Sequence, residues 1–189
     1  MSKTKLIVIS GPSGCGKTTI AKEILRRHLN FFFSVSGTTR TKRSVEIDGK
    51  DYFFLTKEQF EYKIRHDELA EWEQIYGNYY GSLRSEIERA FSANTSILFD
   101  VDVNGALSIK RKYPQAALLI FIKPPSMELL TERLKNRKTE TPDTFAKRME
   151  RVEMELGLAV KFDYTIINET LEQAVDKVDE IIDHVLQST

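Results

Sequence analysis

Residues 6–18 read LIVISGPSGCGKT, a short apolar run followed by a glycine-rich segment. Gly11–Thr18 fits the pattern G-x-x-x-x-G-K-[ST] at every fixed position. The flanking residues fit as well, because an apolar run precedes the pattern and an amphipathic helix begins near Lys17. This order of strand, loop and helix predicts a loop whose backbone N–H groups surround a phosphate.

The loop also has side chains suited to a nucleoside triphosphate. Lys17 supplies positive charge for the β- and γ-phosphates, and the Thr18 hydroxyl is a ligand for Mg²⁺. Cys15 occupies a variable position of the pattern, which favours a small filler over a reactive thiol. The alternative, a glycine-rich turn without a ligand, is disfavoured by the complete motif. The predicted ATP-binding residues of the loop are Gly11, Pro12, Ser13, Gly14, Cys15, Gly16, Lys17 and Thr18.

Apolar runs and helix patterns alternate along the rest of the chain. Three apolar runs are typical of strands buried on both faces, at residues 6–9, 96–99 and 116–122. Two further strand candidates are residues 31–35 and 164–167. Helix patterns cover residues 18–28, 103–112, 126–136 and 171–186. The alternation predicts the α/β class, with a five-stranded parallel sheet wrapped by helices. Residues 36–93 break it with short aromatic strand candidates at 52–55 and 69–76, a helix at 57–66 and glycine turns, which predicts an inserted small mixed α/β region.

Composition excludes several classes of protein. The chain has 189 residues, with 28 Lys and Arg against 28 Asp and Glu, so a surface dedicated to nucleic acid or anionic lipid is not expected. One cysteine excludes an internal disulfide, and three widely spaced histidines disfavour a zinc site. No apolar run approaches the ~18 residues of a membrane span. We expect a cytoplasmic protein without a nucleic-acid, membrane or obligate protein partner.

Charge is uneven along the chain although the total is zero. Residues 133–151 are rich in Lys and Arg, whereas residues 169–189 carry six acidic residues and one lysine. The acidic segment is most simply the solvated face of the last helix.

Residues suited to a second phosphate and a base lie in the inserted region. Arg40 and Arg43 follow an expected strand, and arginine forks suit bidentate phosphate contacts. Tyr52 and Tyr80 add phenolic donors. The carboxylate of Glu71 can accept two hydrogen bonds from adjacent N–H donors, which guanine presents and adenine does not.

Taken together, these segments resemble guanylate kinases over nearly the whole chain. The matching stretches are Ser10–Gly14, Ser34–Ser36, Thr38–Arg40, Gly49–Tyr52, Glu71–Trp72, Gly77–Ser82, Asp100–Asp102 and Pro124–Ser126. The resemblance implies a core of residues 1–35 and 94–189, an insertion at 36–93 that binds the nucleoside monophosphate, and a helical lid at about 137–147. The implied reaction is Mg²⁺-dependent, in-line transfer from ATP to GMP or dGMP, without a covalent intermediate, in purine nucleotide metabolism.

The resemblance also assigns residues to sites. The implied GMP-binding residues are Ser36, Arg40, Arg43, Tyr52, Glu71, Tyr80, Gly81, Ser82 and Asp102. Asp100 joins Thr18 as an implied metal ligand, and Arg133 and Arg137 join the ATP-binding set. The implied catalytic residues are Lys17, Arg40, Arg137 and Arg148. Capping of a strand-to-helix turn is an alternative role for the two aspartates, and a solvated helix face is the alternative for the lid arginines.

Two other functions fit parts of the sequence. A different small phosphate-loop kinase, acting on a ribose bisphosphate or another nucleotide, shares the loop but does not account for Glu71. A peptide-binding guanylate-kinase-like module of a membrane-associated scaffold commonly has a degraded loop, whereas Lys17 and Thr18 are present here. Lys42 and Lys138 depart from the usual family pattern and bear on the flexibility of the phosphate-binding loop and the lid.

Overall fold

The computed structural model describes residues 4–135 and 142–188. Within them, a central sheet runs in the order β2-β7-β1-β8-β9, and each neighbouring pair is parallel. The predicted α/β class and five-stranded parallel sheet are therefore confirmed. The strands are β1 (Leu6–Ser10), β2 (Phe32–Phe33), β7 (Ile97–Asp100), β8 (Ala117–Lys123) and β9 (Tyr164–Ile167).

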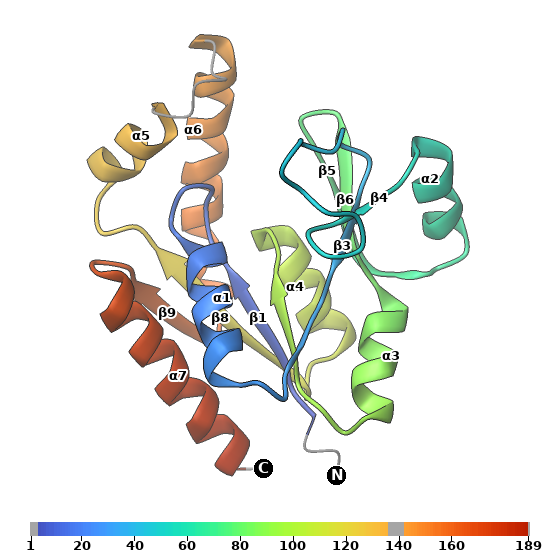
Figure 1. Cartoon of the computed structure of the whole chain (residues 1–189). Helices are drawn as coiled ribbons and strands as arrows, with labels where there is room; N and C mark the ends of the chain where they lie inside the picture. The colour runs from blue at the N-terminus through green and yellow to red at the C-terminus, as the bar shows by residue number, and fades with distance from the viewer. Residues whose placement is uncertain (1–3, 136–141, 189) are drawn as a thin grey trace.

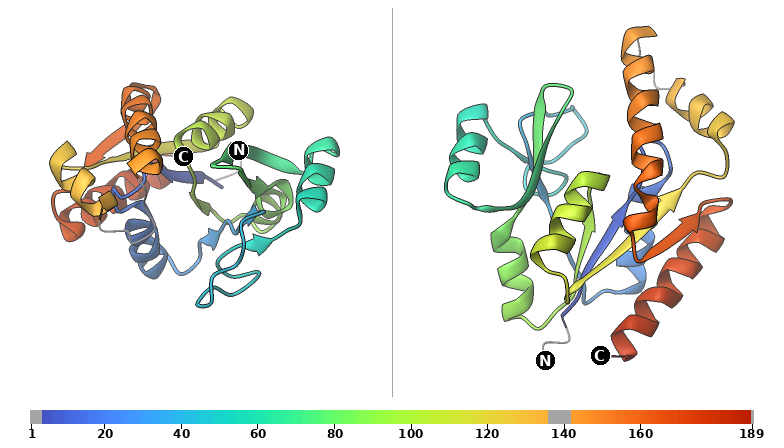
Figure 2. Two further views of the ribbon diagram at one scale, coloured as in Figure 1. Left: turned by 90° about the horizontal axis from the view of Figure 1, so that it is seen from above. Right: turned by 180° about the vertical axis from the view of Figure 1, so that it is seen from behind.

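Helices cover both faces of this sheet, α1 and α7 on one face and α3 and α4 on the other (Figures 1 and 2). Strand β1 explains the layering, because Ile7 and Ile9 pack on the α1 side while Leu6 and Val8 pack on the α4 side. All four side chains are fully buried, as expected of a central parallel strand. The helices are α1 (Lys17–Arg27), α3 (Arg84–Ser92), α4 (Val103–Lys112) and α7 (Leu171–Gln187).

A second sheet, in the order β4-β3-β6-β5, lies beyond the carboxyl ends of the central strands (Figure 1). Its strands are β3 (Ser36–Thr38), β4 (Phe53–Phe54), β5 (Leu69–Ile75) and β6 (Asn78–Leu83). Helix α2 (Lys57–Arg65) flanks it and begins at a capping box formed by Thr56 and Gln59. This sheet lies within the region that breaks the α/β alternation, whereas the exact domain division stays a prediction.

Helices α5 (Met127–Lys135) and α6 (Pro142–Gly157) stand opposite the second sheet (Figure 1). They share a small core in which Leu130, Leu134 and Val152 are buried. A short 3₁₀ helix, η1 (Ala159–Lys161), connects α6 to β9. No helix within residues 4–135 and 142–188 is long and apolar enough to span a bilayer.

Some elements differ from the sequence prediction. Helix α3 and strands β3 and β6 were not predicted, α6 extends beyond the helical lid expected at about 137–147, and the candidate strand at 31–35 shortens to two residues. Residues 139–143, TETPD, resemble a turn within the expected lid. That interpretation is wrong at its last two residues, because α6 begins at Pro142, a position where proline favours the first helical turn. Residues 139–141, and position 136 at the end of a predicted helix, lie outside the described residues.

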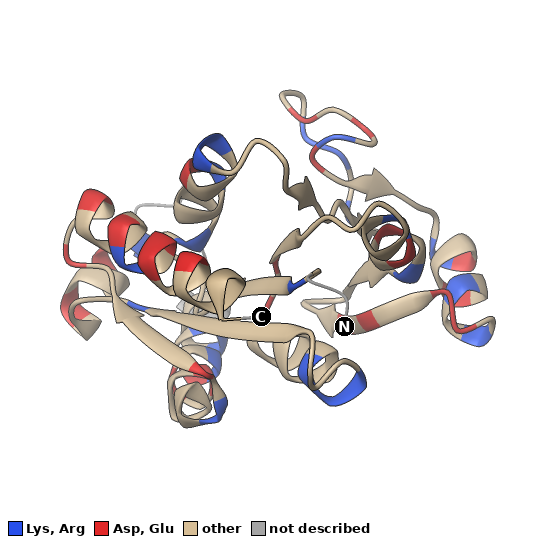
Figure 3. Ribbon diagram, turned by 90° about the horizontal axis from the view of Figure 1, so that it is seen from below, with Lys and Arg blue, Asp and Glu red and all other residues tan. Residues whose placement is uncertain are grey.

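The acidic residues near the C-terminus recur along α7 (Figure 3). Glu172, Glu180 and Asp183 are exposed, which confirms the expected solvated face. Asp176 and Asp179 are exceptions, since they accept hydrogen bonds from Arg27 at 2.7 and 2.9 Å, and Asp179 also pairs with Nε2 of His28 at 2.6 Å. These contacts hold the last helix against the end of α1.

Candidate active site

The loop between β1 and α1 has the backbone geometry that the sequence predicts. Gly16 caps α1 with a left-handed φ of 95°, and a Cβ there would lie 2.4 Å from Nδ2 of Asn168. Helix α1 begins at Lys17, so its first N–H groups lack intrahelical partners and face the loop. Its first turn contains no acidic residue. The arrangement favours a bound anion.

Asn168 supports this loop and was missed by the sequence analysis. Its buried Nδ2 donates a 2.8 Å hydrogen bond to the carbonyl oxygen of Cys15. Cys15 is itself fully buried, and desolvation raises the pKa of its thiol. The cysteine is thus a packed, neutral filler. Asn168 directly follows β9, and a polar residue at the carboxyl end of a parallel strand was the available signal.

Thr18 and Asp100, the two predicted metal ligands, lie in direct contact. The hydroxyl of Thr18 donates a hydrogen bond to Oδ2 of Asp100, which ends β7. Oδ1 of Asp100 is buried and has no hydrogen-bond partner among the residues that the structure describes. Hydroxyl and carboxylate oxygens are ligands that Mg²⁺ prefers, so this donor set fits the ion.

The predicted phosphate-binding arginines lie in different places. Nη1 of Arg133 donates to the carbonyl oxygen of Gly14 at 3.4 Å, which puts its guanidinium at the phosphate loop. The guanidinium carbon of Arg148 lies 5.4 Å from the ring centroid of Tyr76, in the turn between β5 and β6. Arg137 lies outside the described residues.

Arg40, Tyr52 and Tyr80 form a cluster on the second sheet. The Arg40 guanidinium carbon lies 5.4 Å from the Tyr52 ring centroid, and the two tyrosine rings are 6.2 Å apart. Burial raises the pKa of Tyr52, so its hydroxyl stays protonated and can donate. Arg43 is exposed, and its backbone N–H donates to a carboxylate oxygen of Glu46 at 2.8 Å.

Glu46 orients Arg40 and was also missed by the sequence analysis. Its two carboxylate oxygens accept from Nη2 and Nη1 of Arg40 at 2.7 and 3.0 Å. The bond to Arg40 lowers the pKa of Glu46 and keeps the carboxylate ionised. A bidentate pair of this kind fixes the plane of a guanidinium, so Glu46 sets the direction in which Arg40 presents its remaining donors.

Three predicted base-reading residues align across the second sheet. Ser36 of β3 is in register with Ser82 of β6, and Ser82 is in register with Glu71 of β5. The Ser82 hydroxyl donates to Oε1 of Glu71 at 2.6 Å. Glu71 is 4% exposed, and this burial raises its pKa to about 7. A buried carboxylate with such a pKa is poised to bind N–H donors that stabilise its charge.

Asp102 and Gly105 of α4 close the other side of Glu71. Asp102 is the N-cap of α4, and its Oδ1 accepts from the Gly105 N–H at 2.9 Å, so the predicted capping role is confirmed. Burial, followed by a hydrogen bond with Glu73, raises the pKa of Asp102 to about 8. A Cβ at Gly105 would lie 2.6 Å from Oε2 of Glu71. A glycine is therefore needed for the carboxylate to sit against the helix.

The comparisons with known proteins agree with this geometry. A family model described as guanylate kinase matches residues 3–185. The chain belongs to the guanylate kinase family. Its relatives include the guanylate kinase of Chlorobium luteolum, 47% identical over 92% of this chain and 88% of that protein. That of Thermotoga maritima is 46% identical over 95% of this chain and 86% of that protein.

A solved structure supports the same family. The crystal structure of guanylate kinase from Anaplasma phagocytophilum aligns with a TM-score of 0.79 and 30% identity, over 97% of this chain and 87% of that one. The chain is thus a transferase of the nucleoside monophosphate kinase class.

Gly81 lies on β6 between Tyr80 and Ser82 and has no side chain to offer a ligand. A Cβ at Gly81 would meet Phe60 and Trp72 at 3.0 Å, so its side-chain position faces away from Ser82. A GMP contact at Gly81 stays a prediction.

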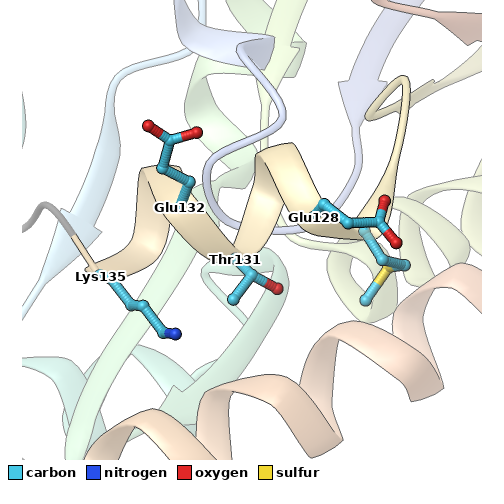
Figure 4. A pocket seen from close by; sticks show the side chains of 5 residues that line it. Glu128, Thr131, Glu132 and Lys135 are labelled. Carbon is cyan, nitrogen blue, oxygen red and sulfur yellow. The ribbon is translucent and has the colours of Figure 1, made fainter.

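A cavity of about 490 Å³ lies along α5 and is lined by Met127, Glu128, Thr131, Glu132 and Lys135 (Figure 4). Two acidic side chains make it a poor fit for a nucleotide phosphate.

Proposed function

We propose that the chain transfers the γ-phosphoryl group of ATP to GMP or dGMP, forming ADP and GDP or dGDP. The observation that carries this proposal lies at the end of β7, where Asp100 and Asp102 face two different parts of the site. Asp100 accepts a hydrogen bond from Thr18 of the phosphate loop, whereas Asp102 lies beside Glu71 of the second sheet. A donor loop and a base-reading carboxylate therefore meet at one strand end.

On the donor side, the residues neutralise phosphate charge. Lys17 and the first N–H groups of α1 would bind the phosphates, and Arg133 beside Gly14 would add a fork of donors. Thr18 and Asp100 would hold Mg²⁺, which supplies further charge neutralisation when it is bound. Arg137 and Arg148 belong to the proposed set of arginines that stabilise charge on the transferring group.

On the acceptor side, Glu71 is proposed to read guanine. Its carboxylate can accept from the N1–H and the 2-amino group together, and each bond favours its ionised form. Adenine presents an acceptor at N1, which a carboxylate repels. Ser36 and Ser82 flank Glu71 in register, and the Ser82 bond restricts its rotation.

The proposed chemistry needs positioning more than proton transfer. The acceptor phosphate is already an anionic nucleophile, so no general base is required. Arg40, held by Glu46, and the hydroxyls of Tyr52 and Tyr80 would align that phosphate with the γ-phosphorus. The contribution of this chain is therefore alignment together with stabilisation of charge on the equatorial oxygens.

ADP release in the presence of ATP and Mg²⁺, measured separately with GMP, AMP, CMP, UMP and TMP, tests the proposal. We expect turnover with GMP and at most about a hundredth of it with the others, because the carboxylate rejects bases without adjacent donors. Equal turnover with AMP would refute guanine reading. GMP binding without any ADP release would favour the scaffold-type binding module instead.

A further inference from the structure

One ionic network crosses from the second sheet to helix α6. Nη2 of Arg151 donates to Oε2 of Glu73 on β5 at 3.0 Å, and Nε of Arg151 donates to Oε1 of Glu155 at 2.7 Å. The other carboxylate oxygen of Glu73 accepts from Nδ2 of Asn104 on α4 at 3.1 Å. Glu73 is thereby held by two helices at once.

This network is sheltered from solvent. The side chains of Arg151 and Glu73 are 19% and 20% exposed, and that of Glu155 is 5% exposed. Exposed ion pairs contribute little, whereas a sheltered, fork-bonded pair restrains both partners. Burial raises the pKa of Glu155, and the positive charges of Arg151 and Lys17 oppose this rise, so the network reaches the electrostatic field of the phosphate loop.

Both ends of the network adjoin residues with proposed roles. Glu73 lies two positions after Glu71 on β5, so the two side chains point to the same face of the strand. Arg151 lies three positions after Arg148 on α6, so these side chains share a helix face. Arg148 makes its own contact with the same hairpin, since it lies over the ring of Tyr76.

We propose that Arg151 is a positioning residue for phosphoryl transfer, which through Glu73 fixes the guanine-reading strand against the helix that carries Arg148. The inference rests on the proposed function, because it concerns how Arg148 is positioned for that reaction. GMP bound at Glu71 would find α6 already seated on β5, with Arg148 at a defined distance from the acceptor. Without the bond between Arg151 and Glu73, α6 would keep its packing against α5 but would no longer be fixed in position against β5.

This role predicts an effect on turnover more than on binding. Neither Arg151 nor Glu73 is proposed to touch a nucleotide, so the KM values for GMP and ATP should stay within about threefold. Misplacing Arg148 weakens an interaction made in the transition state, which lowers kcat. We expect Arg151→Gln and Glu73→Gln each to lower kcat about tenfold.

The test is a double-mutant cycle on kcat, with Arg151→Gln, Glu73→Gln and both together. If the two residues act through one bridge, the double variant should lose about tenfold, as each single variant does, instead of about a hundredfold. Arg151→Lys, which keeps the charge, should recover part of the loss. Glu73→Gln also guards against misfolding, because it leaves the pair between Arg151 and Glu155 intact.

Arg27→Gln is the matched control. It removes an arginine that bonds two carboxylates, Asp176 and Asp179, between α1 and α7 without reaching the second sheet. Its kcat should match that of the unaltered chain. Additive losses in the cycle, an unchanged kcat in Glu73→Gln, or an equal loss in Arg27→Gln would overturn the proposal. An unaltered chain that releases no ADP with GMP would instead refute the proposed function, and this inference with it.

Discussion

The hydroxyl of Thr18 donates a hydrogen bond to Oδ2 of Asp100, which joins the start of α1 to the end of β7. The other oxygen of Asp100 is buried and has no hydrogen-bond partner among the described residues. A buried acceptor of this kind costs free energy unless a ligand satisfies it. The pair is therefore the best-supported part of the proposed Mg²⁺ site.

The first prediction concerns the Mg²⁺ requirement. Asp100→Asn and Thr18→Ala each remove a hard oxygen ligand or its charge, so the Mg²⁺ concentration for half-maximal turnover should rise about tenfold. Turnover measured across a Mg²⁺ titration at fixed ATP and GMP gives this value. Thr18→Ser keeps the hydroxyl and should behave as the unaltered chain does. The site assignment fails if Asp100→Asn leaves the titration curve unchanged.

The second prediction separates two glycines in helices. A Cβ at Gly105 would press on the carboxylate of Glu71, whereas nothing lies within 4 Å of a Cβ at Gly157. Because the end of a flexible side chain can move aside, Gly105→Ala should change the free energy of unfolding by less than about 1 kcal/mol. Its KM for GMP should nevertheless rise about tenfold, since Glu71 is displaced.

Gly157→Ala serves as the control in the same assays. It should alter neither the KM for GMP nor that for ATP, with a stability change of about 1 kcal/mol or less. Equal GMP kinetics in the two alanine variants would show that Gly105 does not shape the base site.

The third prediction is a pH dependence of stability that originates in Glu71. Burial raises its pKa from 4.5 to about 7 in the folded chain. As pH rises through this window, the unfolded state releases its proton first, so the folded state loses stability. Glu71→Gln removes this loss. Between pH 5 and pH 8 the stability of the variant relative to the unaltered chain should improve by about 2 kcal/mol.

Urea unfolding of the two proteins at both pH values measures this difference. The improvement should accompany a weaker affinity for GMP, since the same carboxylate is proposed to read the base. If the stability of the variant relative to the unaltered chain does not change with pH, the pKa of Glu71 is not raised in the folded chain.

The fourth prediction concerns Glu46. Glu46→Gln removes the carboxylate charge and leaves one acceptor in place of two for the Arg40 guanidinium, so the KM for GMP should rise about tenfold while the KM for ATP stays constant. Steady-state kinetics with each nucleotide varied in turn provide the measurement. Lys50→Gln, an exposed change in the same loop, should have no effect. A lower KM for GMP in Glu46→Gln would mean that the pair holds Arg40 back from the phosphate.

An element could be predicted from the sequence where the residues that determine it lie close together in the chain. Helix α1 begins at Lys17 and the helix at 103–112 has its bounds, both as predicted, because glycine spacing and apolar periodicity act over a few residues. Helix α6 carries the same kind of signal in Phe145, Met149, Val152 and Leu156, spaced for one helix face. The helical lid expected at about 137–147 covered only the first part of this helix, so the continuation of α6 to Gly157 was missed.

Supporting residues were missed because their partners are distant in the chain. Asn168 bonds to Cys15 across 153 positions, and Arg151 bonds to Glu73 across 78. The position of Asn168 directly after β9 was its one available signal, and no local pattern distinguishes Arg151 from an ordinary surface arginine. Only the folded arrangement gives them a role, whereas Glu71 was identified through the chemistry of guanine and the family resemblance.

The most direct test of the central claim is the kcat/KM for GMP compared with that for inosine monophosphate, which lacks the 2-amino group. If Glu71 reads both N–H donors of guanine, the unaltered chain should prefer GMP by at least about a hundredfold. In Glu71→Gln, whose neutral amide can accept only at its oxygen, the preference should fall below about tenfold. Equal use of the two nucleotides by the unaltered chain, or an undiminished preference in Glu71→Gln, would contradict the account.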